Sequence, residues 1–320
     1  MMINSSKPSS INGVLNTKIG HIIGTADIND KHDRSAPSDY HWKILKCRMI
    51  IFSSSSLVAC PDKRDLKQVH IIFNKNGDDY DKINAMFCKY LLTQDGPIRE
   101  PTSELFEMCF EYTMTARLAP IWNALGSDYL INNRNFLTSK GPQEGVKYKI
   151  KTKGEITTIS LKAVKIILHQ VNGEAKLGEY VRVLPSLNKA IVEECFDSLP
   201  TSGNFNSYKD LRRHWKNIHG YRLPENDSSY YYSIQFWRGE PLTYPQYCVT
   251  RNFPTVTPVL KSAEQIILSR FINCLKSKFF NMLGRPLSFE QNYSINNGNN
   301  VGDDLLETQN VSLCTPTQTH

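Results

Sequence analysis

A strict alternation of apolar residues and lysines at positions 146–151 constrains the fold more than any other feature of this sequence. Val, Tyr and Ile occupy the even positions and Lys the odd ones, and a turn through 152–155 leads into a second β-rich run, 156–161. Successive side chains of a strand point to opposite faces of a sheet. The pattern therefore predicts an antiparallel hairpin with one buried face and one face of lysines.

Other runs rich in β-forming residues predict further strands. We expect them at 43–53, 67–73, the second half of 105–118, and in a second hairpin that joins 230–237 to 242–249. The segment 94–102 contains one glycine and two prolines and is expected to be a loop.

Helical spacing of apolar residues predicts helices at 81–92, 187–199, 208–219 and 263–283. The third of these has the clearest limits, because Ser207 and Asp210 resemble a capping box and Gly220 follows the last turn. Strand and helix patterns follow one another without a regular βαβ alternation. We therefore expect an α+β fold, with a mixed, mainly antiparallel sheet packed by about three to five helices.

The two ends of the chain differ from the middle in composition. Residues 1–42 and 289–320 are rich in Ser, Asn, Gln, Asp and Thr, and such segments cannot bury enough apolar surface to offset the entropy of ordering. We expect both to be disordered, around an α+β body at 43–288 that is either undivided or divided into two lobes, 43–175 and 176–288.

The net charge is +7, and it is unevenly distributed. The segment 289–320 carries four acidic residues and no Lys or Arg, so its charge is −4 and that of the remainder is +7 + 4 = +11. This excess is compatible with a polyanionic partner, and it is also ordinary for a soluble basic protein.

Several features point to an intracellular compartment and away from familiar enzyme classes. The chain starts without a secretory signal pattern and contains no run of ~18 apolar residues, so we expect cytoplasm or nucleus and no membrane. Its eight cysteines form no C-x-x-C pair and are expected to be reduced core thiols. Phosphate-binding glycine loops and a G-x-S-x-G elbow are missing from the sequence, so we predict no catalytic residues and no cofactor.

The segment 205–225 (FNSYKDLRRHWKNIHGYRLPE) carries the main candidate surface. On its helix, Tyr208, Leu211, Trp215 and Ile218 form a stripe that must face the core. The basic residues then point away from it, and we predict that they bind nucleic acid or a protein partner: Lys209, Arg212, Arg213, Lys216 and the following Arg222.

The same segment imitates half of a zinc finger. Phe205, Leu211, His214 and His219 follow the spacing F-x5-L-x2-H-x4-H, but no cysteine pair lies upstream. Two ligands do not make a structural zinc site. We therefore predict no metal, and expect His214 to pack beside Trp215 at the edge of the core.

Several blocks of this sequence resemble an uncharacterised animal protein family, typified by the product of human chromosome 18 open reading frame 63. The blocks lie within 105–286 and include TMTARLAPIWN (113–123), SIQFWRGEPLTYPQYCV (233–249) and the string S-Y-x-D-x-x-R-H-W…G-Y-R-L-P. That string supplies a structural signature: Tyr208, Leu211, His214, Trp215 and Tyr221.

The family carries a domain of unknown function, so the resemblance transfers no catalytic residue. Its vertebrate members combine the domain with a long basic tail, which implies a nuclear or scaffold role, whereas the tail here is short and acidic. Taken together, the sequence predicts a non-enzymatic scaffold module with an unknown protein partner. The alternatives are nucleic-acid binding through the helix 208–219 and an enzyme of unrecognised type.

Overall fold

The computed structural model describes residues 9–12, 18–26, 39–154, 156–201, 205–237 and 239–288; at 9–12 and 39 it describes the backbone alone. The disorder predicted for 289–320 lies outside the described residues, as does most of the disorder predicted for 1–42.

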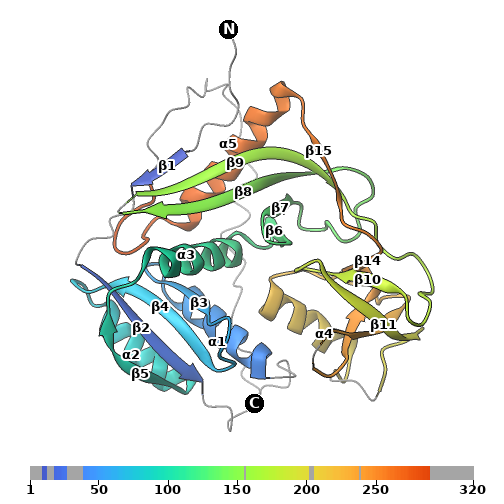
Figure 1. Cartoon of the computed structure of the whole chain (residues 1–320), viewed down its shortest axis with the longest axis horizontal. Helices are drawn as coiled ribbons and strands as arrows, with labels where there is room; N and C mark the ends of the chain where they lie inside the picture. Colours follow the sequence, from blue (N-terminus) through green and yellow to red (C-terminus); the bar gives the residue numbers. More distant parts are fainter. Residues whose placement is uncertain are drawn as a thin grey trace.

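The first sheet is built from the N-terminal third of the chain (Figure 1). Its four antiparallel strands have the order β3 (Val58–Pro61), β4 (Gln68–Asn74), β2 (Ile19–Ala26) and β5 (Leu92–Arg99). Helices α1 (Asp39–Ser53) and α2 (Asp79–Tyr90) pack on one face, where alternate residues of β4 join their apolar core. The predicted strand 67–73 and helix 81–92 are thus confirmed.

Helix α3 (Ser103–Leu118) covers the other face of that sheet and joins it to a second one (Figure 1). The second sheet has the order β1 (Ser9–Asn12), β9 (Ile156–Ile167), β8 (Gln143–Lys153), β7 (Tyr129–Asn132) and β6 (Trp122–Leu125), with β15 (Thr255–Pro258) also on β9. Helices α3 and α5 (Lys261–Lys278) bury the apolar face of β8 and β9. The predicted lysine hairpin and the C-terminal helix are confirmed.

The third sheet comes from the C-terminal half. Its antiparallel strands have the order β13 (Leu242–Pro245), β12 (Tyr231–Gln235), β11 (Asn188–Phe196), β10 (Tyr180–Val183) and β14 (Val249–Thr250), and a short turn η3 (Gln246–Cys248) precedes β14. Its inner face packs on α4 (Tyr208–His214) and on the π-helical turn η2 (Trp215–His219). The second predicted hairpin and the helix at 208–219 are confirmed, and so is the mainly antiparallel α+β class.

Two segments adopt the opposite structure from the one predicted. The expected strand 43–53 lies in helix α1, whose residues 41–48 are all buried between the first sheet and η2. An apolar run that is buried on every side does not show helical periodicity. The expected helix 187–199 is largely strand β11, in which buried Ala190 and Val192 alternate with exposed Lys189 and Ile191.

Two further expectations are wrong. Helix α3 runs to Leu118 without a strand in its second half, because it lies between two sheets and carries apolar residues on both sides. Most of the expected loop 94–102 belongs to β5, an edge strand whose register shifts opposite β2. An edge position tolerates the proline within it, because one side of the strand needs no hydrogen-bond partner.

The N-terminal boundary at residue 43 is also wrong. Strand β2 is a central strand of the first sheet, and α1 begins at residue 39. The run IGHIIGTA has two glycines that weaken its strand signal. They are needed because rings lie directly on the strand: a Cβ at Gly20 would be 2.7 Å from Phe73, and one at Gly24 would be 2.9 Å from Phe87.

Two further findings concern the cysteines and the length of the helices. All seven described cysteines are free thiols, and five of them are buried. Among the described helices, none combines the length and apolar character needed to span a membrane.

Candidate functional site

Helix α4 starts and ends as its sequence predicts. The side chain of Ser207 accepts a hydrogen bond from the backbone N–H of Asp210 at 3.2 Å and donates one to its carboxylate at 2.8 Å. Gly220 ends the segment with a left-handed φ of 76°. The last five residues form a π-helical turn, in which the N–H of Gly220 bonds to the carbonyl oxygens of Trp215 and Lys216.

The signature residues lie on the inner side of α4 and η2. Leu211, Trp215 and Tyr221 are buried, and the ring of Trp215 contacts those of Tyr221 and Tyr244. The Tyr208 hydroxyl donates to the carbonyl oxygen of Pro224 at 2.9 Å. Burial raises the pKa of the Tyr221 hydroxyl well above its ordinary value, and this group donates to the Ala124 carbonyl oxygen. These side chains attach α4 to the third sheet and to β6.

The basic residues of this segment point outward. Lys209, Arg213, Lys216 and Arg222 are exposed and Arg212 is partly exposed. Three arginines face carboxylates: Arg213 lies 3.8 Å from Asp210, and Arg212 and Arg222 lie 4.0 and 3.7 Å from Glu225. Five cations and two anions leave +5 − 2 = +3 on this surface, which we call the helix face. Its binding role stays a prediction.

A second basic surface lies on β8 and β9, and we call it the lysine face. Lys147, Lys149, Lys151 and Lys153 are exposed along β8, and exposed Lys162 of β9 lies directly opposite Lys147. Lys147 pairs with Asp128 at 3.4 Å. Among the described residues, no carboxylate lies within 4.0 Å of the other four lysines.

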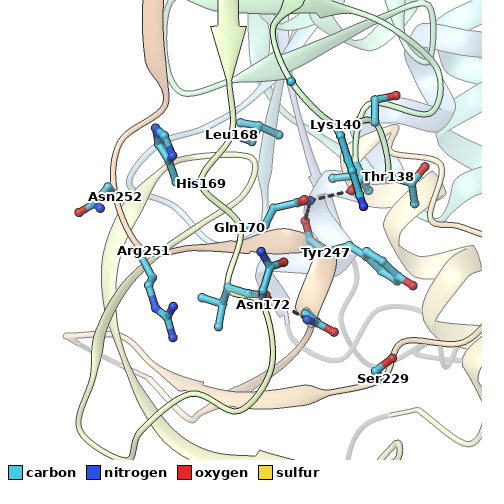
Figure 2. Close-up of a pocket in the computed structure, with 15 residues that line it drawn as sticks. Thr138, Lys140, Leu168, His169, Gln170, Asn172, Ser229, Tyr247, Arg251 and Asn252 are labelled. Carbon is cyan, nitrogen blue, oxygen red and sulfur yellow. Dashed lines mark hydrogen bonds between the residues drawn. The ribbon is translucent and has the colours of Figure 1, made fainter.

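A polar pocket of about 730 Å³ opens between the second and third sheets (Figure 2). Gln170 connects two of the segments that line the pocket. Its amide nitrogen donates hydrogen bonds to the carbonyl oxygens of Leu137 at 2.7 Å and Tyr247 at 2.8 Å. Lys140 and Tyr247 both line it (Figure 2). No motif in the sequence indicated this pocket, since its residues come from four separate loops and from η3.

The charged groups at this pocket are largely engaged. Arg251 pairs with Glu179 at 2.9 Å, and His169 hydrogen-bonds to Thr255 at 2.7 Å. The described lining therefore offers amides, hydroxyls and one lysine for hydrogen bonding to a polar ligand. It does not bring a nucleophile within reach of a base and an orienting carboxylate.

Sequence reasoning missed His41, the partner of the two histidines in the zinc-finger-like spacing. Ring nitrogens of His41, His214 and His219 all lie within 4.8 Å of one another. His214 packs against Phe205 and His41, with ring centroids 5.0 Å apart in both cases, and Trp215 contacts His219. Burial, and to a lesser extent His214, lowers the pKa of His41 to about 3; burial also lowers that of His219 well below its ordinary value.

Solved structures with some similarity to this chain include three Argonaute structures. That of Marinitoga piezophila with a 5′ OH guide RNA is 10% identical over 77% of this chain and 32% of that one, with a TM-score of 0.36. Its complex with guide RNA and target DNA is 12% identical over 86% and 36%, with a TM-score of 0.34. The A. aeolicus protein is 9% identical over 85% and 42%, also at 0.34. The chain thus spans less than half the length of each.

A family comparison covers most of the described body. The sequence model of a domain of unknown function, DUF4708, matches residues 25–175 and 168–258. These two stretches make up more than half of the 320 residues and include the lysine face, the helix face and all three histidines of the cluster. The chain therefore belongs to the family defined by the domain of unknown function DUF4708.

Proposed function

We propose that this chain binds nucleic acid and that the lysine face is its main contact surface. The observation that carries the proposal is the row of five exposed lysines on β8 and β9 with a single neighbouring carboxylate. Like charges placed directly opposite one another destabilise a strand pair. Lys147 and Lys162 are such a pair, and a polyanion bound across them would remove that cost.

The dimensions of the row suit a phosphate backbone. Lysines two residues apart on a strand are separated by about 7 Å, and the four lysines of β8 form a row along one face of the sheet. Several of them can therefore contact phosphates of one nucleic-acid backbone at the same time. Bound cations on the nucleic acid would be released to solution, which makes such binding strongly dependent on salt.

The helix face is the second candidate surface for contact with nucleic acid. The lysine face carries five cations and one carboxylate, +5 − 1 = +4, and four of its lysines face no described carboxylate. On the helix face, three of five cations already face Asp210 or Glu225. Exposed ion pairs of this kind contribute little energy, so these arginines can still exchange a carboxylate for a phosphate.

Fluorescence anisotropy with single-stranded and duplex oligonucleotides over a salt series tests the proposal. The double variant Lys149→Gln and Lys151→Gln should weaken binding and reduce the log–log salt slope by about 1.4 on single strands. Arg212→Gln with Arg213→Gln measures the helix face. The charge-matched control is Lys63→Gln with Lys67→Gln, which changes two exposed lysines in the loop between β3 and β4. Absence of binding at low salt, or an equal loss in this control, would overturn the proposal.

A protein-binding role is the second candidate, because aromatic side chains are exposed near the third sheet. Trp237 is 95% exposed, Tyr180 59% and Phe253 58%. Lys189 lies 3.7 Å from the ring centre of Tyr180, and Arg182 lies 3.3 Å from that of Phe253. Exposed aromatics and arginines are the residues that dominate protein interfaces.

This candidate is tested by comparing partners captured by the unchanged chain with those captured by Trp237→Ala plus Tyr180→Ala. Partners lost from the variant, with thermal stability retained, would favour the scaffold interpretation. An identical set of partners would remove this face from consideration.

A further inference from the structure

The three clustered histidines come from two distant parts of the chain. His41 lies in the first turn of α1, His214 is the last residue of α4, and His219 is the last residue of η2. Helix α1 packs on the first sheet, whereas α4 and η2 pack on the third. The cluster therefore lies where the N-terminal and C-terminal halves meet.

The π-helical turn is what aligns His214 with His219. In an α-helix, residues five apart differ by 5 × 100° = 500°, about 140° around the axis. A π-helical turn has i→i+5 hydrogen bonds, so residues five apart lie nearly above one another. The bond from the Gly220 N–H to the Trp215 carbonyl is of this type. Such turns occur frequently at functional sites.

Close packing holds this turn in place. At Gly220, an added Cβ would lie 2.8 Å from Cβ of Ala119 and 3.1 Å from a guanidinium nitrogen of Arg48. The φ of 76° at Gly220 is also one that other residues rarely adopt. The turn is thus pressed against α1 and the end of α3, which keeps His219 beside His41.

The cluster lies in aromatic surroundings. His41 and His214 are only 6% and 5% exposed, and they contact the rings of Tyr40 and Phe205. The ring of His219 contacts that of Trp215, and this histidine is partly exposed.

Arg48 is the charged group that influences this site. It is buried, its Nε atom has no hydrogen-bond partner in the described part of the chain, and one of its guanidinium nitrogens lies against Gly220, the residue after His219. A guanidinium at this position opposes a bare dication. It favours a metal ion that carries an anionic fourth ligand, such as hydroxide or chloride, to which it could also donate.

We propose that His41, His214 and His219 bind one zinc ion, and that its fourth position is open to water or a small anion beside Arg48. Imidazole nitrogens suit zinc, with bonds of about 2.0–2.1 Å that place tetrahedral ligand atoms roughly 3.3 Å apart. The ring nitrogens, now within 4.8 Å, reach this spacing by small side-chain rotations. Bound zinc would join α1 to η2 and so connect the two halves of the chain.

The test uses the full chain after removal of metal by a chelator. Zinc is added in competition with a chromophoric chelator, and bound metal is counted by mass spectrometry after dialysis. We expect one zinc per chain, and a loss of affinity of about a hundredfold or more in His41→Ala, His214→Ala and His219→Ala. His169→Ala is the matched control, because His169 is exposed, hydrogen-bonds to Thr255 and is not part of the cluster.

Cobalt provides a second measurement that separates this site from adventitious surface binding. A cobalt ion held by three imidazoles in tetrahedral geometry absorbs visible light far more strongly than hydrated cobalt. We expect this absorption in the unchanged chain and in His169→Ala, and its loss in the conservative variant His219→Gln, which guards against unfolding in the alanine variants. No zinc retained, or zinc and absorption retained by His219→Gln and His41→Ala, would overturn the proposal.

Discussion

Two groups of histidines lie in the described part of the chain, and they differ in the groups that surround their ring nitrogens. In the first sheet, His21 of β2 lies 3.1 Å from His70 of β4, and His70 lies 2.7 Å from the carboxylate of Asp62. The second group is His41, His214 and His219 between α1 and η2.

The first group is satisfied by hydrogen bonds. His70 uses both ring nitrogens, one toward His21 and one toward Asp62. Asp62 in turn accepts from the backbone N–H groups of Arg64 and Asp65 at 2.6 and 2.7 Å. Desolvation alone would raise the pKa of Asp62, but these hydrogen bonds and that of His70 outweigh it and lower the pKa to about 2.

The second group contains no carboxylate, and the nearby charge is the cation of Arg48. The comparison teaches that the neighbours of a histidine, more than its burial, decide its chemistry. A carboxylate such as that of Asp62 fixes one tautomer of the histidine beside it. Both ring nitrogens of His70 are then engaged in hydrogen bonds within the protein. Three imidazoles gathered without a carboxylate among them form a set of nitrogen donors that suits a metal ion.

The largest expected effect on stability concerns Trp215, the aromatic residue that packs beside the second group. Trp215 is 2% exposed and contacts His219, Tyr221 and Tyr244. We expect Trp215→Ala to lower the free energy of unfolding by about 3–5 kcal/mol, measured by urea denaturation. Trp237→Ala is the control, because its ring is almost fully exposed, and it should change stability by less than about 0.5 kcal/mol. Equal stability of the two variants would show that the ring of Trp215 is not part of the core.

A smaller effect separates the two groups directly and rests on the zinc proposal. Zinc at a hundred times its dissociation constant should stabilise the folded chain by about 2.7 kcal/mol. We expect thermal unfolding to show this gain in the unchanged chain and in His70→Ala, because His70 belongs to the first group. The gain should disappear in His41→Ala. A zinc-dependent gain lost in His70→Ala and kept in His41→Ala would reverse the assignment.

Local signals in the sequence explain which elements could be predicted. The lysine hairpin follows from alternation alone, and α4 follows from its Ser207 cap, its apolar stripe and Gly220. Helix α1 and strand β11 could not be assigned correctly, since one is buried on all sides and the other carries apolar side chains on both faces. Their structures depend on the sheets that surround them.

The same distinction applies to the candidate sites. The outward direction of Arg213 and Lys216 follows from the stripe on their own helix. The zinc-finger-like spacing identified His214 and His219, but an apolar stripe does not distinguish an α-helical turn from a π-helical one. The third histidine, His41, lies in a segment that the sequence assigns to a disordered end. Its approach to His214 depends on how the two halves pack, which no local pattern encodes.

The smallest effect tests the first group through its response to acid. Burial, helped by the charges of His70 and Arg99, lowers the pKa of His21 in the folded chain to about 4, against 6.5 for an ordinary histidine. Below pH 6.5 the unfolded chain therefore binds a proton that folded His21 does not. The free energy of unfolding should fall by up to about 1.4 kcal/mol per pH unit from this residue, in total by about 1.6 kcal/mol between pH 6.5 and 5, and the loss should level off below pH 4.

Urea denaturation at pH 5–7 with chelator present measures this slope. We expect His21→Asn to reduce this slope by the contribution of about one proton, and we expect His169→Ala to leave the slope unchanged. An unchanged slope in His21→Asn would contradict this prediction. It would mean that His21 is protonated in the folded chain as readily as in the unfolded chain.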